Sequence, residues 1–157
     1  MDKFYTGVGS RNTPKDILAE IVTIASKLDN LNYVLRSGGA KGADLAFELS
    51  CDNSEIFYAS DSTPEAEAIA SKFHPAWNKC NAYARRLHGR NAFQVLGRDL
   101  KTPSKFLICW TLDGCIRHVD RTIRTGGTGT AISIADHYGV KIFNLANHSH
   151  TRRLRNL

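Results

Sequence analysis

Three short segments of the chain combine glycine with hydroxyl or basic side chains, a composition that suits loops that hold phosphate. They are residues 7–11 (GVGSR), 37–42 (SGGAKG) and 125–130 (TGGTGT). Glycine lets the backbone turn with positive φ and approach a ligand closely. A helix that follows adds free N–H groups and the positive end of its dipole. One such turn is weak evidence, but three at matching positions in one fold predict a shared phosphate site. None of the three fits the Walker A or the full GxGxxG pattern.

The ligand-binding candidates are the residues of these loops and polar or aromatic side chains near them in the expected fold. They are Gly9, Ser10, Arg11, Ser37, Gly38, Gly39, Lys41, Asp44, Arg90, Trp110, Asp113, Gly126, Gly127, Thr128, Gly129 and Thr130. Trp110 ends an apolar run and so lies near the crevice by topology. Asp113 either contacts a ribose or a base, or belongs to a plain Asp-Gly turn.

Three acids near the glycine loops are weak catalytic candidates: Asp44, Glu48 and Asp136. Asp44 either stabilises the start of its helix through the dipole or contacts a ribose. Glu48 either faces a sugar or is an exposed helix acid. The sequence leaves both choices open.

The sequence predicts no metal site, no cofactor and no disulfide framework. The four cysteines form no CxxC pair, and four histidines lack ligand spacing on a common helix: His118, His137, His148 and His150. Trp77, which follows His74 and Pro75, either stacks on a base or fills a packed corner.

Short apolar runs alternate with helical patterns along the chain. We expect strands at 4–8, 32–36, 55–59, 106–110 and 140–145, and helices opening at Thr13-Pro14 and Thr63-Pro64 and spanning 43–49, 76–87, 91–100 and 130–138. Such alternation favours parallel pairing, so the sequence predicts an α/β fold: a single Rossmann-like domain over residues 1–146 with an open, mainly parallel, doubly wound sheet. Ligands of such sheets bind where the strand order reverses.

Two segments stay ambiguous. Residues 111–124 are longer than the roughly 2–6 residues of a usual connection and form either a lid or a small hairpin. Residues 147–157 form a basic tail that either contacts nucleic acid or is a solvated surface.

The composition favours an anionic partner. Of 157 residues, 42% are hydrophobic and 23% charged, and the formal net charge is +6, which favours nucleic acid or a phosphorylated small molecule. No apolar run approaches the roughly 20 residues of a membrane span, and residues 1–10 lack the apolar core of a leader. We expect no membrane association and a cytoplasmic location.

The motifs YTGVGSR, RSGGAKGAD, LHGRNAFQVLG, FLICW and TGGTGTAISIADHYGVKIFNL together resemble the SLOG superfamily over residues 4–145. That superfamily includes the Rossmann domain of DNA-processing protein A (DprA) and the Lonely Guy phosphoribohydrolases. The resemblance implies a nucleotide-derived ligand and a homodimer or higher oligomer. Small stand-alone members occur in phage genomes, so it also implies a phage protein acting in the host cytoplasm.

Two comparisons within the superfamily bear on activity. Arg90 and the turn Gly126 to Thr130 match the Lonely Guy motifs, but Thr125 stands for the family's proline and Ser133 for its catalytic glutamate. A serine cannot stabilise an oxocarbenium-like ribose, so we lean against an enzyme. The match of RSGGAKGAD to the DprA loop implies a phosphate-rich ligand, with single-stranded DNA as one option.

The first hypothesis is therefore a protein that binds a phosphorylated nucleotide or a nucleotide-derived signalling molecule and sequesters or senses it, as in phage counter-defence. The alternatives are a Lonely Guy-like N-glycosidase acting on a nucleotide, and a DprA-like binder of single-stranded DNA.

Overall fold

The computed structural model describes residues 3–157, and its centre is one five-stranded, all-parallel sheet. Its strands are β1 (Lys3–Gly7), β2 (Tyr33–Ser37), β3 (Ser54–Ile56), β4 (Phe106–Cys109) and β5 (Lys141–Asn144). Their order across the sheet is β3-β2-β1-β4-β5, with every neighbouring pair parallel. The predicted Rossmann-like fold is thus confirmed, and the strand order reverses between β1 and β4.

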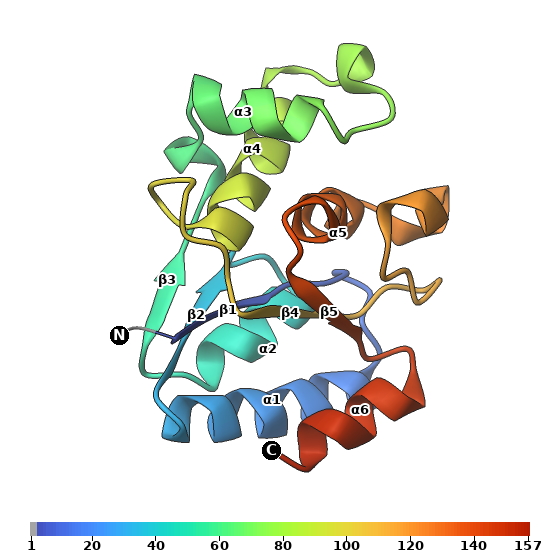
Figure 1. Ribbon diagram of the computed structural model, residues 1–157. Coiled ribbons are helices and arrows are strands. Elements are labelled where there is room, and N and C mark those ends of the chain that lie inside the picture. The colour runs from blue at the N-terminus through green and yellow to red at the C-terminus, as the bar shows by residue number, and fades with distance from the viewer. Residues whose placement is uncertain (1–2) are drawn as a thin grey trace.

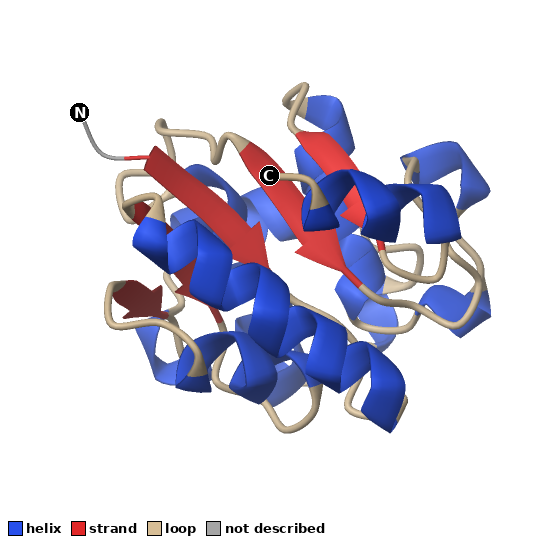
Figure 2. Ribbon diagram, turned by 90° about the horizontal axis from the view of Figure 1, so that it is seen from below, coloured by secondary structure: helices blue, strands red, loops and turns tan. Residues whose placement is uncertain are grey.

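Helices cover both faces of the sheet (Figure 1). One face carries α1 (Lys15–Asn30), α2 (Ala43–Leu49) and α6 (His148–Arg155), and the other carries α3 (Pro64–Ser71), α4 (Ala82–Leu96) and α5 (Thr128–His137). Figure 2 looks onto the first of these faces and shows the strands pointing the same way. Each face buries its own core: Leu107 and Cys109 of β4 join one, and Ile108 joins the other. This explains the continuous apolar sequence of β4.

The two Thr-Pro pairs behave differently, although the sequence predicts the same helix start for both. Thr63 caps α3 as predicted, accepting the N–H of Ala66 at 3.3 Å. At α1 the prediction is wrong, because Pro14 itself is the N-cap and Thr13 makes no cap. The Thr13 hydroxyl instead donates to the Ser10 carbonyl at 2.6 Å. Thr13 therefore fixes the glycine loop rather than the helix.

The two helices predicted at 76–87 and 91–100 are in fact the single helix α4, preceded by the short 3-10 turn η2 (Trp77–Lys79). The break expected between them is wrong because Gly89 is a packing glycine. A Cβ there would lie 2.2 Å from Ser62 Oγ and 2.8 Å from Glu67 Cγ. The missing side chain lets α4 pack closely on the start of α3, so the helix continues through Gly89.

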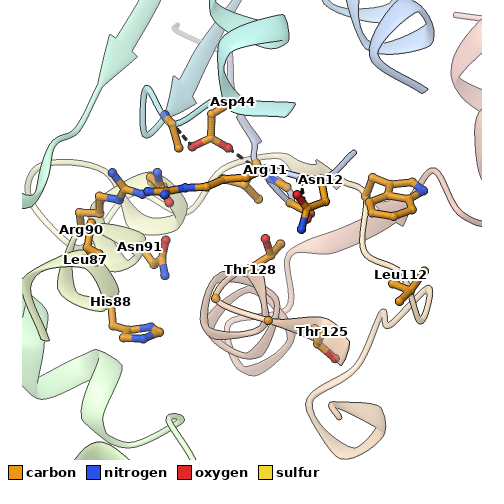
Figure 3. Close-up of a pocket in the computed structure, with 18 of the residues that line it drawn as sticks. Arg11, Asn12, Asp44, Leu87, His88, Arg90, Asn91, Leu112, Thr125 and Thr128 are labelled. Carbon is orange, nitrogen blue, oxygen red and sulfur yellow. Dashed lines mark hydrogen bonds between the residues drawn. The ribbon is translucent and has the colours of Figure 1, made fainter. Parts of the chain in front are cut away.

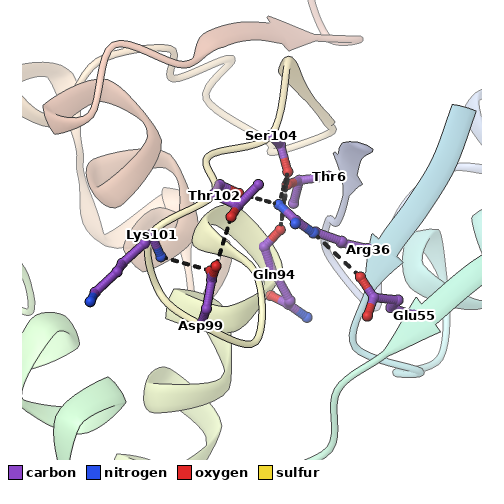
Figure 4. Close-up of polar contacts among 8 residues, drawn as sticks. All are labelled: Thr6, Arg36, Glu55, Gln94, Asp99, Lys101, Thr102 and Ser104. Carbon is purple, nitrogen blue, oxygen red and sulfur yellow. Dashed lines mark hydrogen bonds and ion pairs between the residues drawn. The ribbon is translucent and has the colours of Figure 1, made fainter. Parts of the chain in front are cut away.

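A buried polar network joins the C-terminal end of α4 to the sheet (Figure 4). Arg36 of β2 is 2% exposed; it donates to the Thr102 carbonyl at 2.6 Å and pairs with Glu55 at 3.6 Å. The Thr6 hydroxyl of β1 donates to the Gln94 carbonyl at 2.5 Å. Because a buried polar group left unpaired is costly, these contacts favour the observed position of α4 over the sheet.

The two ambiguous segments are ordered. Residues 111–124 contain the 3-10 turn η3 (His118–Asp120) and the start of η4 (Ile123–Thr125), and the described chain forms no hairpin there. The expected basic tail contains α6, which lies against α1: Arg155 pairs with Glu20, and Leu154 is buried. No helix within residues 3–157 combines the length and the apolar character that crossing a membrane requires.

Candidate functional site

A cavity of about 550 Å³ opens at the carboxyl ends of β1 and β4, where the strand order reverses (Figure 3). The loop after β1 and the end of β4 form part of its wall, the starts of α2 and α5 form more, and one face of α4 closes it. This is the position at which open α/β sheets bind ligands.

Nine of the predicted ligand-binding residues line this cavity. They are Gly9, Ser10, Arg11, Asp44, Arg90, Trp110, Gly126, Gly127 and Thr128. The other seven are not on its wall: Ser37, Gly38, Gly39, Lys41, Asp113, Gly129 and Thr130. The first and third glycine loops therefore meet at one cavity. The second loop reaches it only through Ala40, and Asp44 lines it from α2, the helix that follows.

The second loop supports the site from behind. The Ser37 hydroxyl is buried and donates to the Gly7 carbonyl at 2.6 Å. A Cβ on Gly38 would lie 2.3 Å from Gln94 Nε2 and 2.9 Å from Asp44 Oδ2. Glycine at position 38 thus leaves room for two polar side chains that do line the cavity.

Asp113 organises the loop after β4. Its carboxylate accepts the hydroxyls of Thr111, Thr122 and Thr125 and the N–H of Cys115, at 2.5–3.2 Å. Although burial alone would raise the pKa of Asp113, these hydrogen bonds bring it below its usual range. The Asp-Gly turn reading describes this geometry, with Gly114 at φ +69°.

The start of α5 is open towards the cavity. Gly127 is its N-cap, and no side chain within residues 3–157 caps the helix. A Cβ built on Gly126 or Gly127 would have no described atom within 4 Å. Gly126 has φ +68°, which favours glycine, whereas Gly127 has helical angles that any residue adopts. The N–H groups of Gly129 and Thr130 donate to the Gly126 and Gly127 carbonyls at 3.0 and 3.4 Å. The N–H groups of Gly127 and Thr128, together with the dipole of α5, are therefore the part of this helix start that suits an anion.

The glycine of the first loop serves packing instead. A Cβ on Gly9 would lie 2.7 Å from Ala43 Cβ and 3.2 Å from the Trp110 backbone. The absence of a side chain lets the loop after β1 pass closely between α2 and the end of β4. The same arrangement lets the Gly9 N–H donate to Asp44.

Asp44 lies at the base of the cavity with its carboxylate largely enclosed. It is 4% exposed and accepts the N–H groups of Gly9 at 3.2 Å and Ala40 at 3.5 Å. Burial raises the pKa of Asp44 to about 6, against the opposing effects of Arg90 and these N–H groups. Among the described residues that line the cavity, Asp44 is the only acid.

Three arginines bring positive charge to the cavity wall: Arg11, Arg90 and Arg124. Arg90 is half-buried, and its Nη1 donates to the Gly38 carbonyl at 3.0 Å. Both other arginines are exposed: Arg11 lies in the loop after β1 and Arg124 in the 3-10 turn η4. In Figure 3 the Arg11 and Arg90 side chains lie on the same side of the cavity as Asp44.

The predicted binding residues leave out a group that also lines the cavity, although one member, Thr125, belongs to the third glycine loop. They are Asn12, Leu87, His88, Asn91, Gln94, Leu112, Arg124 and Thr125. Four of these lie on one face of α4 at helical spacing, and the expected helix break at 88–90 hid that pattern. Gln94 is the most informative: it is 1% exposed, and neither Oε1 nor Nε2 has a hydrogen-bond partner among the described residues. A buried unpaired amide on a cavity wall has donors and acceptors left over for a ligand or for water.

Ser133, the residue expected at the position of the Lonely Guy glutamate, does not line the cavity. Ser133 is fully buried, and its hydroxyl contacts His118 Nδ1 at 2.7 Å and Arg121 Nη1 at 3.4 Å. Glu48 and Asp136 are also absent from the cavity wall, and Asp136 accepts the backbone N–H of His118. Of the three weak catalytic candidates, only Asp44 lies at the site.

Trp77 packs away from this cavity. Its ring lies 6.1 Å from the His74 ring and 6.4 Å from the His88 ring, and the Arg85 guanidinium stands 5.4 Å above it. The packed corner therefore describes Trp77 better than a base-stacking platform.

Comparison of the chain with protein-family models, curated proteins and solved structures gives no match. The fold is therefore known from the structure itself, and the resemblance to the SLOG superfamily stays a prediction.

Proposed function

We propose that this protein binds a phosphorylated nucleotide, or a nucleotide-derived signalling molecule, in the cavity between β1 and β4 and sequesters or senses it. One observation carries the proposal: the uncapped start of α5 opens onto a cavity whose wall also holds Arg11, Arg90 and Arg124. Free backbone N–H groups, a helix dipole and guanidinium groups are the donors that phosphate takes.

The rest of the cavity suits the other parts of a nucleotide. Trp110 and Leu112 offer apolar surface on which a base could stack. Asp44, Asn91 and Gln94 offer acceptors and donors for ribose hydroxyls or base edges. The volume of about 550 Å³ falls within the roughly 300–1,000 Å³ of small-molecule sites.

We infer binding without turnover because the site, within the described residues, lacks a free carboxylate suited to glycosidic cleavage. Cleaving a glycosidic bond builds positive charge on the ribose, which a nearby carboxylate stabilises. Ser133 supplies none, and Asp44 already accepts two backbone N–H groups. One observation favours the N-glycosidase alternative, since a carboxyl group with a pKa near 6 is suited to acid–base chemistry at neutral pH.

Native mass spectrometry of protein purified from cells, followed by calorimetry with AMP as the probe, tests the proposal. A co-purified nucleotide mass or saturable AMP binding is expected, with no free base released on incubation. Gly127→Asp and Gly127→Asn form a matched pair of nearly equal size, and the aspartate should weaken AMP binding more because it repels phosphate. Equal AMP affinity in both variants and the parent would overturn the phosphate assignment.

The assay for free base separates the two candidates. Base release from AMP that stops in Asp44→Asn would replace sequestration by the N-glycosidase. The resemblance to the SLOG superfamily adds the expectations of a homo-oligomer, a cytoplasmic location and a phage origin.

A further inference from the structure

A second group of reactive side chains lies beside the cavity, where the chain between α3 and α4 folds back on itself. His74 follows α3, Cys80 follows the turn η2, and His88 lies in α4. The ligand atoms of these three side chains all lie within 4.8 Å of one another. The sequence predicted no metal site from the lack of a CxxC pair and from four other histidines, and it did not bring these three residues together. The 3-10 turn Trp77–Lys79 is what returns Cys80 to His74.

The distances approach those of a metal site. Cys80 Sγ lies 3.7 Å from His74 Nε2 and 3.9 Å from His74 Nδ1, and the two imidazole rings are 4.3 Å apart between centroids. Zinc bonds of about 2.3 Å to sulfur and 2.0–2.1 Å to nitrogen in a tetrahedron place neighbouring ligand atoms roughly 3.3–3.6 Å apart. Small side-chain rotations would therefore close this set around one ion.

The surroundings supply an outer shell. His88 Nδ1 lies 2.9 Å from Thr130 Oγ1, which leaves His88 Nε2 to face an ion. A hydrogen bond on the far nitrogen is the usual partner of a metal-bound imidazole, because it fixes the ring and its tautomer. Trp77 lies beside both imidazoles, and all three candidate ligands are only partly exposed. His74 Nδ1 accepts the N–H of Ala76 at 3.0 Å, and that bond would be given up on metal binding.

We propose that His74, Cys80 and His88 form a site for a divalent transition metal of the zinc class. The donor set is two imidazole nitrogens and one sulfur. On binding, the Cys80 thiol loses its proton to solvent and the thiolate bonds to the metal. Three protein ligands leave a fourth tetrahedral position for water or another oxygen ligand, as in zinc sites that keep an open position. His88 also lines the nucleotide cavity, so the ion would lie at its edge.

Titration of the reduced, chelator-treated full chain with Co²⁺ tests this site without any nucleotide. We expect a saturable thiolate-to-cobalt absorption band in the near ultraviolet and intense visible bands of tetrahedral Co²⁺, both abolished when Zn²⁺ is added. Cys80→Ser should lose the near-ultraviolet band. The matched control Cys51→Ser changes another half-buried cysteine, outside the group, and should keep it.

His74→Ala gives a second test, in a loop residue outside the helices. It should weaken Zn²⁺ binding by more than the roughly 10–100-fold that loss of an outer-shell partner costs, while circular dichroism stays unchanged. The proposal is overturned by the absence of a saturable cobalt band in the parent protein, by a thiolate band that survives in Cys80→Ser, or by unchanged Zn²⁺ affinity in His74→Ala.

Discussion

At the residue scale, Asp44 ties the stability of the protein to the charge at the base of its cavity. Its pKa is raised to about 6 by burial, whereas an unfolded aspartate titrates near about 3.9. Between these values the folded protein holds the proton more tightly than the unfolded chain. Asp44 therefore lowers the free energy of unfolding as the pH rises through this window.

Asp44→Asn should remove that pH dependence. We expect the stability of the variant relative to the parent to increase from about pH 4 to pH 7, because only the parent must ionise a buried carboxyl. Urea unfolding at a series of pH values measures this difference. A constant difference across the series would mean that the carboxyl titrates normally in the folded protein.

Replacing the Gln94 amide by an apolar side chain should raise or keep the stability of the protein and weaken ligand binding. Its amide is buried without a partner among the described residues, which costs about 1–3 kcal/mol. Gln94→Met keeps the shape without the polar atoms, so the melting temperature should rise or hold while AMP affinity falls. Asn78→Met, at an exposed site away from the cavity, is the control. A variant that loses stability and keeps its AMP affinity would show the amide to be structural.

Arg90 predicts a loss of affinity on the scale of a charge-assisted bond. Arg90→Ala should weaken AMP binding by about 1.5–3 kcal/mol. Arg152→Ala removes the same charge from the exposed surface of α6 and should leave AMP binding unchanged. Arg90 also donates to the Gly38 carbonyl, so calorimetric affinities are compared only after melting curves show both variants folded. A negligible loss of affinity in Arg90→Ala would leave that backbone bond as its role.

At the element scale, the two glycines at the start of α5 have different roles. Gly127 is proposed to leave space for the ligand, whereas Gly126 is needed for the backbone conformation. Gly127→Val places its side chain in open space with helical backbone angles, so the protein should stay folded and lose AMP binding. Gly126→Ala meets the strain of φ +68° instead and should lower the melting temperature. Melting curves and calorimetry on the pair check both halves. Intact AMP binding in Gly127→Val would move the phosphate elsewhere.

At the scale of the whole molecule, the +6 net charge favours both a small phosphorylated ligand and a polynucleotide. The salt dependence of binding distinguishes the two. Part of the basic charge is engaged within the fold, since Arg155 pairs with Glu20 and the Arg153 guanidinium lies 5.3 Å from the Phe143 ring. AMP has a single phosphate, so its affinity should fall only mildly as salt rises. Single-stranded DNA that neutralises several phosphates would show a log–log slope of roughly −0.7 for each phosphate.

A titration of oligo-dT and AMP over the same salt series measures this. Tight oligo-dT binding with a steep slope, together with weak AMP binding, would replace sequestration by the DprA-like alternative.

The sequence by itself determined the architecture. Apolar runs separated by helical patterns are local features, and a chain that alternates them has few ways to pair its strands. The same alternation placed the first glycine loop and Trp110 at strand ends and the third glycine loop beyond β4, and these segments supply seven of the nine predicted residues that line the cavity. The glycine-rich loops at that edge could be recognised from the sequence without knowing which residues pack against them.

Only the tertiary structure decided which side chains face the cavity. Ser37 and Asp113 look like ligand contacts in sequence, but each is satisfied by groups from its own fold. Gly89 looks like a helix break until Ser62 is seen packed against it. Partners distant along the chain determine whether a polar side chain is free, and the same distant packing gathers His74, Cys80 and His88 into one group.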